Sequence, residues 1–108
     1  MTPNEVCEVF CERGVSLRLE ARTYELETSE ELAQEYIIIE GNAEALRFLG
    51  ELLVAQATFP NDCHCFIHPS GPGSVFFGDG ASCGVSIHRL PCEHGDLRNC
   101  ARPNSAGA

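Results

Sequence analysis

The segment from Asn42 to Ala57 reads NAEALRFLGELLVAQA, and its apolar residues recur at helical spacing. Two interleaved sets carry this pattern, namely Leu46, Leu49 and Leu53, and Ala45, Phe48, Leu52 and Ala55. Asn42 is a favourable N-cap, and Pro60 supplies a stop. We therefore predict a helix over residues 42–57. Gly50 inside this helix costs up to about 1 kcal/mol relative to alanine, which predicts close packing against another element.

Two β-strands are predicted before this helix. Residues 36–40 read YIIIE, a β-branched run typical of a strand buried on both faces or nearly so. Residues 15–22 read VSLRLEAR and alternate apolar with polar side chains, which predicts a strand with one face in solvent.

Residues 3–12 fit two structures. Thr2 and Glu5 resemble a capping box before a helix, but EVCEVFCER also fits a strand, and we favour a strand paired with residues 15–22.

Three short apolar runs follow the helix and predict the strands of a meander, over residues 65–67, 74–77 and 85–89. The fold class is therefore α+β, with an antiparallel or mixed sheet of about five strands packed on one main helix over residues 42–57. We expect a single domain over residues 1–92. Periodicity is lost after this point, so residues 93–108 are expected to form an irregular, disordered tail.

The glycine-rich segment of residues 70–84 resembles a phosphate-binding loop in composition alone. No helix is predicted after it and no basic residue lies within it, which excludes that function. We interpret it as a mobile loop and hairpin region, in which exposed Phe76 or Phe77 could contact a partner.

The charge of the chain limits its partners. The formal net charge is −9, and residues 1–51 hold twelve Glu against four Arg. An acidic surface repels nucleic acid and anionic lipid and attracts a basic protein, so we expect a protein partner of that kind, no nucleic acid and no membrane. The alternative is that a solvated face simply carries these acids, namely Glu20, Glu25, Glu27, Glu30, Glu31 and Glu35. The chain also lacks lysine, which excludes a Walker-type phosphate loop, a Schiff base and a Ser-Lys pair.

The start of the chain and its cysteines indicate the cellular compartment and the state of the thiols. The chain opens without a basic, then apolar, leader pattern, and no run approaches ~20 apolar residues, so we expect a cytoplasmic protein. Seven cysteines in a reducing compartment predict mostly free thiols. Cys7 and Cys11 are interpreted as structural, because free cysteine tends to be buried.

Histidines and cysteines concentrate after residue 62, and thiolate with imidazole is the donor set that zinc prefers. The spacing argues against a zinc site, because Cys-x-Cys and Cys-x-His do not form the usual Cys-x2-Cys knuckle. We therefore assign no metal and no cofactor, and the residues that a zinc site would have to unite are Cys63, Cys65, His68, His88, Cys92 and His94. Cys65 with His68 or His88 is the one combination suited to an activated thiolate, but no nucleophile signature surrounds it, so no catalytic residue is assigned.

The stretch YIIIEGNAEALRFLGELLVAQA, followed later by SIHRL, resembles the centre of small bacterial immunity-type proteins of polymorphic toxin systems. The resemblance covers about half of the chain and implies a protein that binds and neutralises a toxin rather than an enzyme. We therefore expect a non-enzymatic protein-binding domain with an acidic recognition surface, as a monomer or homodimer. The alternatives are a metal- or thiol-site protein that uses the C-terminal Cys and His residues, and a homo-oligomeric structural domain.

Overall fold

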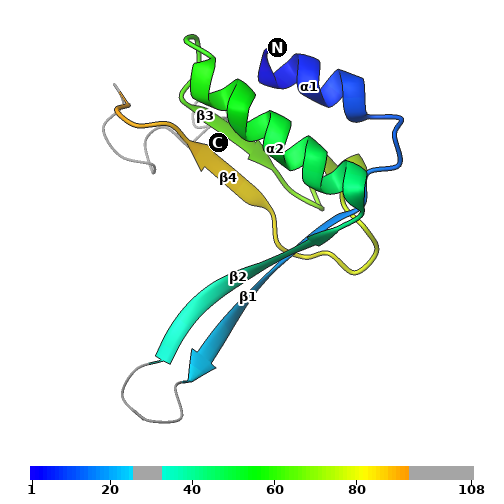
Figure 1. Ribbon diagram of the computed structural model, residues 1–108, viewed down its shortest axis with the longest axis vertical. Coiled ribbons are helices and arrows are strands. Elements are labelled where there is room, and N and C mark those ends of the chain that lie inside the picture. Colours follow the sequence, from blue (N-terminus) through cyan, green and yellow to red (C-terminus); the bar gives the residue numbers. More distant parts are fainter. Residues whose placement is uncertain (26–32, 93–108) are drawn as a thin grey trace.

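The computed structural model describes residues 1–25 and 33–92. In chain order the elements are α1 (Pro3–Phe10), β1 (Leu17–Glu25), β2 (Ala33–Gly41), α2 (Ala43–Thr58), β3 (His64–Ile67), the 3-10 helix η1 (Ser74–Phe76) and β4 (Val85–His88) (Figure 1). The predicted α+β class is confirmed. The tail predicted over residues 93–108 lies outside the described residues.

The first element is helix α1, so the strand favoured for residues 3–12 is wrong. Thr2 and Glu5 form a complete capping box: the Glu5 N–H donates to Thr2 Oγ1 over 3.2 Å, and the Thr2 N–H donates to Glu5 Oε1 over 2.9 Å. Val6 and Phe10, one turn apart, are buried. The reciprocal cap satisfies two backbone donors of the first turn, and the buried pair anchors the helix to the core.

Helix α2 confirms the strongest prediction from the sequence. Asn42 is its N-cap: its Oδ1 accepts from the Ala45 N–H over 2.9 Å, and its Nδ2 donates to the Gly14 carbonyl over 2.8 Å. The close packing predicted for Gly50 is wrong, because this residue is exposed and a Cβ built on it would meet no atom within 4 Å. The buried residues of α2 lie on its other side, namely Ala45, Phe48, Leu49, Leu52, Ala55 and Gln56.

The strands form two antiparallel sheets of two strands each in the described part of the chain, β1–β2 and β3–β4. Single bridges, Leu17 to Phe77 and Leu19 to Cys83, link β1 to the segment between η1 and β4. The predicted sheet of about five strands is not found, because α1 replaces its first strand and η1 replaces the strand predicted over residues 74–77. Gly73, at a φ of 77°, starts the tight turn of η1, a turn that an extended strand cannot make.

The core lies between the two helices, the first half of β1 and the β3–β4 sheet. Phe48 is its centre: the Phe10 ring lies 5.7 Å from it and the Phe76 ring stacks on it at 4.1 Å, centroid to centroid. Phe76 is therefore buried rather than exposed as predicted, and Phe77 is half-buried against the same core. Along β1 the core ends at Leu19.

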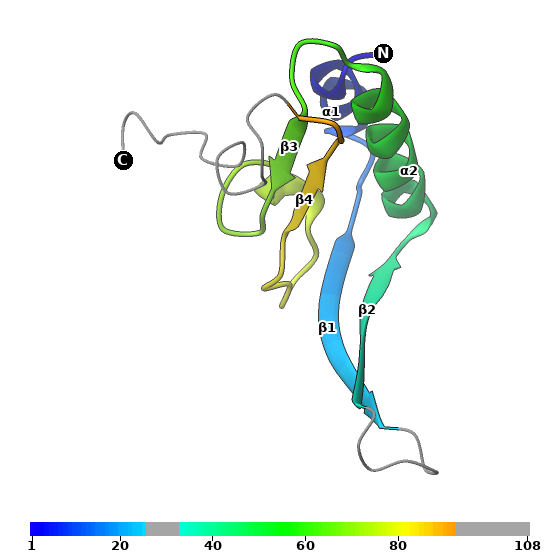
Figure 2. The ribbon, with the colours of Figure 1, turned by 90° about the vertical axis from the view of Figure 1, so that its left-hand side faces the viewer.

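Beyond Leu19 and its partner Ile39, strands β1 and β2 project from the rest of the molecule as an arm (Figures 1 and 2). The burial predicted for residues 36–40 is consequently wrong. Ile38 is half-buried and its neighbours in this run are exposed. Neither helix of the described residues is long and apolar enough to cross a membrane.

Candidate functional site

The arm has one apolar face. Because side chains alternate along a strand, the register from Leu17 opposite Gly41 places Ala21, Ile37 and Ile39 on the side that holds Leu17 and Leu19 in the core. A Cβ built on Gly41 would lie 2.6 Å from the Ala45 Cβ, so this side of the arm is also the side on which α2 packs. We call Ala21, Ile37 and Ile39 the arm face.

No described residue covers the arm face fully. Ile37 is 63% exposed, Ile39 is 48% exposed, and Ala21 is also exposed. The apolar surface that begins in the core thus continues into solvent. A two-stranded pair is marginally stable in water unless further strands or a helix pack against it, so the arm face is a surface that gains from a partner.

The opposite face of the arm is charged. Arg18 and Arg22 flank Glu20 on the same side of β1, with nitrogen-to-oxygen distances to its Oε2 of 3.8 and 3.2 Å. The hydrogen bond that Arg22 donates to the Glu20 carboxylate raises the pKa of Arg22 above its ordinary value. Exposed pairs of this kind contribute little stability, but they hydrate this face, so the two faces of the arm differ in polarity.

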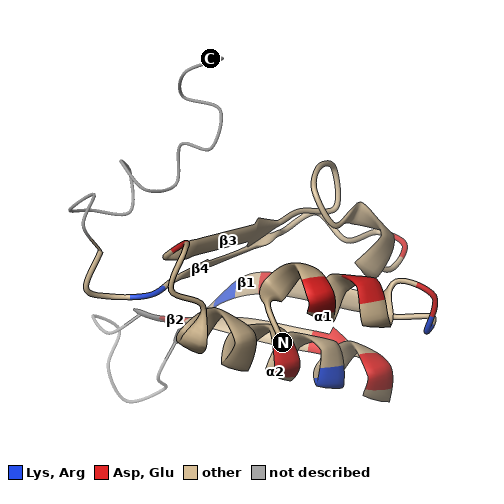
Figure 3. Cartoon of the chain, turned by 90° about the horizontal axis from the view of Figure 1, so that it is seen from above, with Lys and Arg blue, Asp and Glu red and all other residues tan. Residues whose placement is uncertain are grey.

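A second feature is the acidity of the two helices, along which Figure 3 marks the Asp and Glu positions in red. The acids of this helix surface are Glu5, Glu8 and Glu12 of the α1 region and Glu44 and Glu51 of α2. Only Glu44 has an ion pair among the described residues of this surface, with Arg47 at 2.9 Å and Arg13 at 3.8 Å. The surface therefore keeps an excess of negative charge, as the charge distribution predicts.

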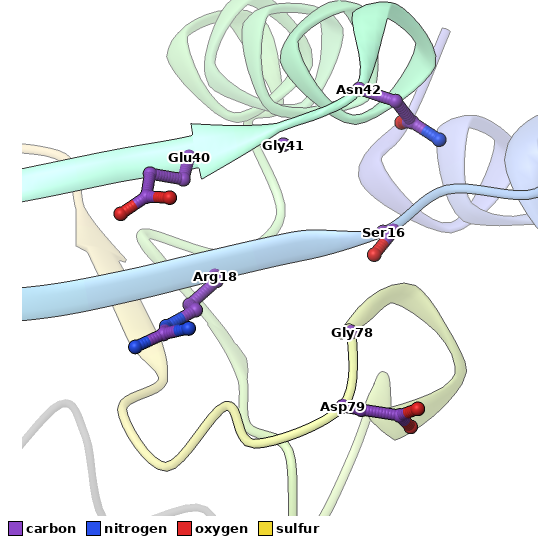
Figure 4. Close-up of a pocket in the computed structure, with 7 residues that line it drawn as sticks. All are labelled: Ser16, Arg18, Glu40, Gly41, Asn42, Gly78 and Asp79. Atoms are coloured by element: carbon purple, nitrogen blue, oxygen red, sulfur yellow. The ribbon is translucent and has the colours of Figure 1, made fainter.

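An open hollow of about 510 Å³ lies at the base of the arm (Figure 4). It is lined by Ser16, Arg18, Glu40, Gly41, Asn42, Gly78 and Asp79. Several of these groups already have structural partners: Asn42 caps α2, and the Gly78 N–H donates to the Leu17 carbonyl over 3.0 Å. None of the described residues that line it is a cysteine or histidine, so these residues offer no thiol or imidazole nucleophile–base pair.

The cysteine and histidine candidates divide into two groups. Cys63, His88 and Cys92 converge, with one donor atom of each within 4.8 Å of the others, and the two Sγ atoms lie 2.8 Å apart. Cys65 and His68 do not join them. His94 lies outside the described residues.

Cys65 does not fit an activated thiolate. Its side chain packs against the core, and burial, together with the neighbouring Cys7, raises its pKa to about 11. His68 Nδ1 accepts a hydrogen bond from the Ser70 N–H over 2.9 Å and so serves the turn after β3. Since the thiolate is the nucleophile, a raised pKa opposes the chemistry for which Cys65 was a candidate.

The arm face was not predicted from the sequence, because the run YIIIE suggests the same burial for all three isoleucines. Pairing with the strand VSLRLEAR places Ile37 and Ile39 on one face and Ile38 on the other. The alternation of apolar and polar residues in VSLRLEAR is the signal that could have indicated this difference. Comparisons of the chain with protein-family models, with curated proteins and with solved structures find no match.

Proposed function

We propose that this chain is a non-enzymatic, immunity-like protein-binding domain that recognises a basic partner through the arm face. The observation that carries the proposal is the exposure of Ile37 and Ile39 on a face that continues the core. Contiguous exposed apolar surface with a polar surround is typical of protein interaction sites.

Covering the arm face supplies the driving force. Full burial of an isoleucine side chain contributes about 1.5–3 kcal/mol, so covering one that is about half exposed contributes on the order of 1 kcal/mol. The arm also gives its partner an extended backbone surface, since β1–β2 is a two-stranded sheet in the described part of the chain. An added strand would pair with such an edge, and its own apolar side chains would lie beside the isoleucines on the same face of the sheet.

Charge selects the partner. The chain carries a formal net charge of −9, and the helix surface keeps an excess of carboxylates. Such a field accelerates encounter with a basic protein and is screened by salt. The same field would oppose the binding of nucleic acid.

The test compares three isoleucine variants on neighbouring positions of β2. Ile37→Ser and Ile39→Ser change the arm face, and Ile38→Ser is the matched control on the opposite face. In affinity capture from the host cell lysate, we expect wild type and Ile38→Ser to retain the same basic protein, with retention falling as salt rises. Each arm-face variant should lower the affinity for that isolated partner on the order of tenfold.

Three outcomes would contradict the proposal. Capture of no basic protein, or equal capture by all three variants, would remove the arm face from recognition. A solution mass showing a homodimer that Ile37→Ser dissociates would make the arm face a self-association surface instead.

A further inference from the structure

We propose that Cys63, His88 and Cys92 form a zinc-binding site, independent of the arm. The backbone brings them together at one end of the β3–β4 sheet. Cys63 directly precedes β3 and His88 is the last residue of β4, and the ladder continues past them, since the Arg89 N–H donates to the Cys63 carbonyl over 2.7 Å. Cys92 lies four residues after His88, so three parts of the chain meet at this end of the sheet.

The donor set suits zinc. One thiol sulfur from each cysteine and one ring nitrogen of His88 lie within 4.8 Å of one another, and Cys63 is only 7% exposed. Thiolate and imidazole together favour zinc over the hard cations Mg²⁺ and Ca²⁺, which take oxygen ligands. The described residues supply three ligands, and the fourth tetrahedral position is left to solvent or to another donor.

His88 supplies the second, independent observation. Its Nε2 is buried and has no hydrogen-bond partner among the described residues. A buried polar nitrogen without a partner is costly and rare in native structures. Metal coordination through this nitrogen would satisfy it.

The neighbouring His64 is already engaged elsewhere. Its Nε2 lies 2.7 Å from Ser86 Oγ, and its ring meets that of His88 edge-on at 6.4 Å between centroids. It therefore does not compete for the same position. The cluster lies at the end of β4 that points away from the arm, so a metal there would act on the sheet rather than on the arm face (Figure 2).

The distance between the two sulfur atoms does not by itself distinguish a zinc site from a disulfide. The position of His88 is needed to favour one of them. The Sγ atoms of Cys63 and Cys92 lie 2.8 Å apart. Two thiolates on one tetrahedral zinc lie about 3.8 Å apart, given Zn–S bonds of about 2.3 Å, and a disulfide measures about 2.05 Å. Either species needs a shift of about 1 Å, but a disulfide would leave His88 Nε2 unsatisfied, whereas zinc uses all three residues.

The experiment uses the full chain purified without a histidine tag under reducing conditions. We expect one zinc per chain by elemental analysis, and thiolate-to-cobalt charge-transfer absorption when Co²⁺ replaces it. Cys92→Ser and His88→Gln should each lose stoichiometric metal, while the matched controls Cys11→Ser and His68→Gln keep it. A chelator should lower the melting temperature of wild type but not that of Cys92→Ser, because only a species that binds the metal is stabilised by it.

Circular dichroism of each variant shows whether loss of metal reflects loss of folding. Cys92 is half-buried whereas Cys63 is buried, so Cys92→Ser disturbs the packing less than a change at Cys63 would. The proposal is overturned if wild type holds no stoichiometric metal after zinc reconstitution. It is equally overturned if folded Cys92→Ser and His88→Gln bind metal as wild type does. A Cys63–Cys92 disulfide that forms in preference to zinc binding, detected by peptide mass mapping, would also overturn it.

Discussion

At the scale of single residues, Thr2 caps the first helix, α1. Replacing an N-cap threonine with alanine costs about 1 kcal/mol, and α1 holds Val6 and Phe10 in the core, so Thr2→Ala should destabilise the whole domain by about that amount. Urea unfolding at neutral pH measures it. Thr23→Ala, at an exposed strand position that caps no helix, is the control and should change stability little.

The same cap predicts a pH dependence through Glu5. Hydrogen bonds from Thr2 lower the pKa of Glu5 below its ordinary value of 4.5. A lowered pKa in the folded state means that the ionised carboxylate stabilises the fold above pH 4.5, and that this contribution is lost as the pH falls through the lowered value. The deficit of Glu5→Gln relative to wild type should therefore shrink on acidification. A deficit that stays constant with pH would show that the carboxylate does not act through its charge.

Residue types in this segment could not by themselves choose between helix and strand. The capping box was visible in Thr2 and Glu5, but Val6, Val9 and Phe10 fit both periodicities. What decided the structure was the burial of Val6 and Phe10 in the core, where the Phe10 ring lies against Phe48, a residue far along the chain. Such contacts are not encoded in local spacing.

At the scale of elements, two glycines test the packing of α2, because one lies in open space and the other in a crowded position. Gly50 is exposed within the helix and a Cβ there would meet nothing within 4 Å, so Gly50→Ala should stabilise the protein by about 0.5–1 kcal/mol. Gly41→Ala should destabilise it, because its Cβ would lie 2.6 Å from the Ala45 Cβ and 2.7 Å from the Ser16 carbonyl oxygen. Chemical denaturation measures both, and destabilisation by Gly50→Ala would contradict the exposed position of this face.

Helices and strands could be predicted where the pattern that indicates them lies within a short stretch of sequence. Asn42 and the leucine spacing define α2, and the apolar runs at residues 65–67 and 85–89 became β3 and β4. Burial of β2 was not predictable, because it depends on how far the core extends along the arm. The approach of Cys63, His88 and Cys92 likewise follows from strand register and the path after β4, and their spacing in the sequence argued against it.

At the scale of the whole molecule, Arg89 joins the β3–β4 sheet to the helices. It follows β4, and its Nη1 donates to the Gln56 carbonyl over 2.9 Å, to the Asp62 carbonyl over 3.3 Å and to the Phe59 carbonyl. These acceptors lie at the C-terminal end of α2 and in the loop after it, where a helix leaves carbonyls without partners and where a positive charge is favoured. The two halves of the fold thus share one polar junction.

Removing this junction should destabilise the domain as a unit. Hydrogen bonds from a charged donor contribute about 1.5–3 kcal/mol, so Arg89→Ala should lower the free energy of unfolding by about 2 kcal/mol. Arg89→Lys should fall between it and wild type, because lysine keeps the charge but its differently shaped side chain cannot place a donor at the position of Nη1 without a shift. Arg22→Ala, which removes an exposed arginine on the arm, is the control and should have little effect. If Arg89→Ala unfolded at the same denaturant concentration as wild type, the β3–β4 sheet would have to be held on the helices by its apolar side chains alone.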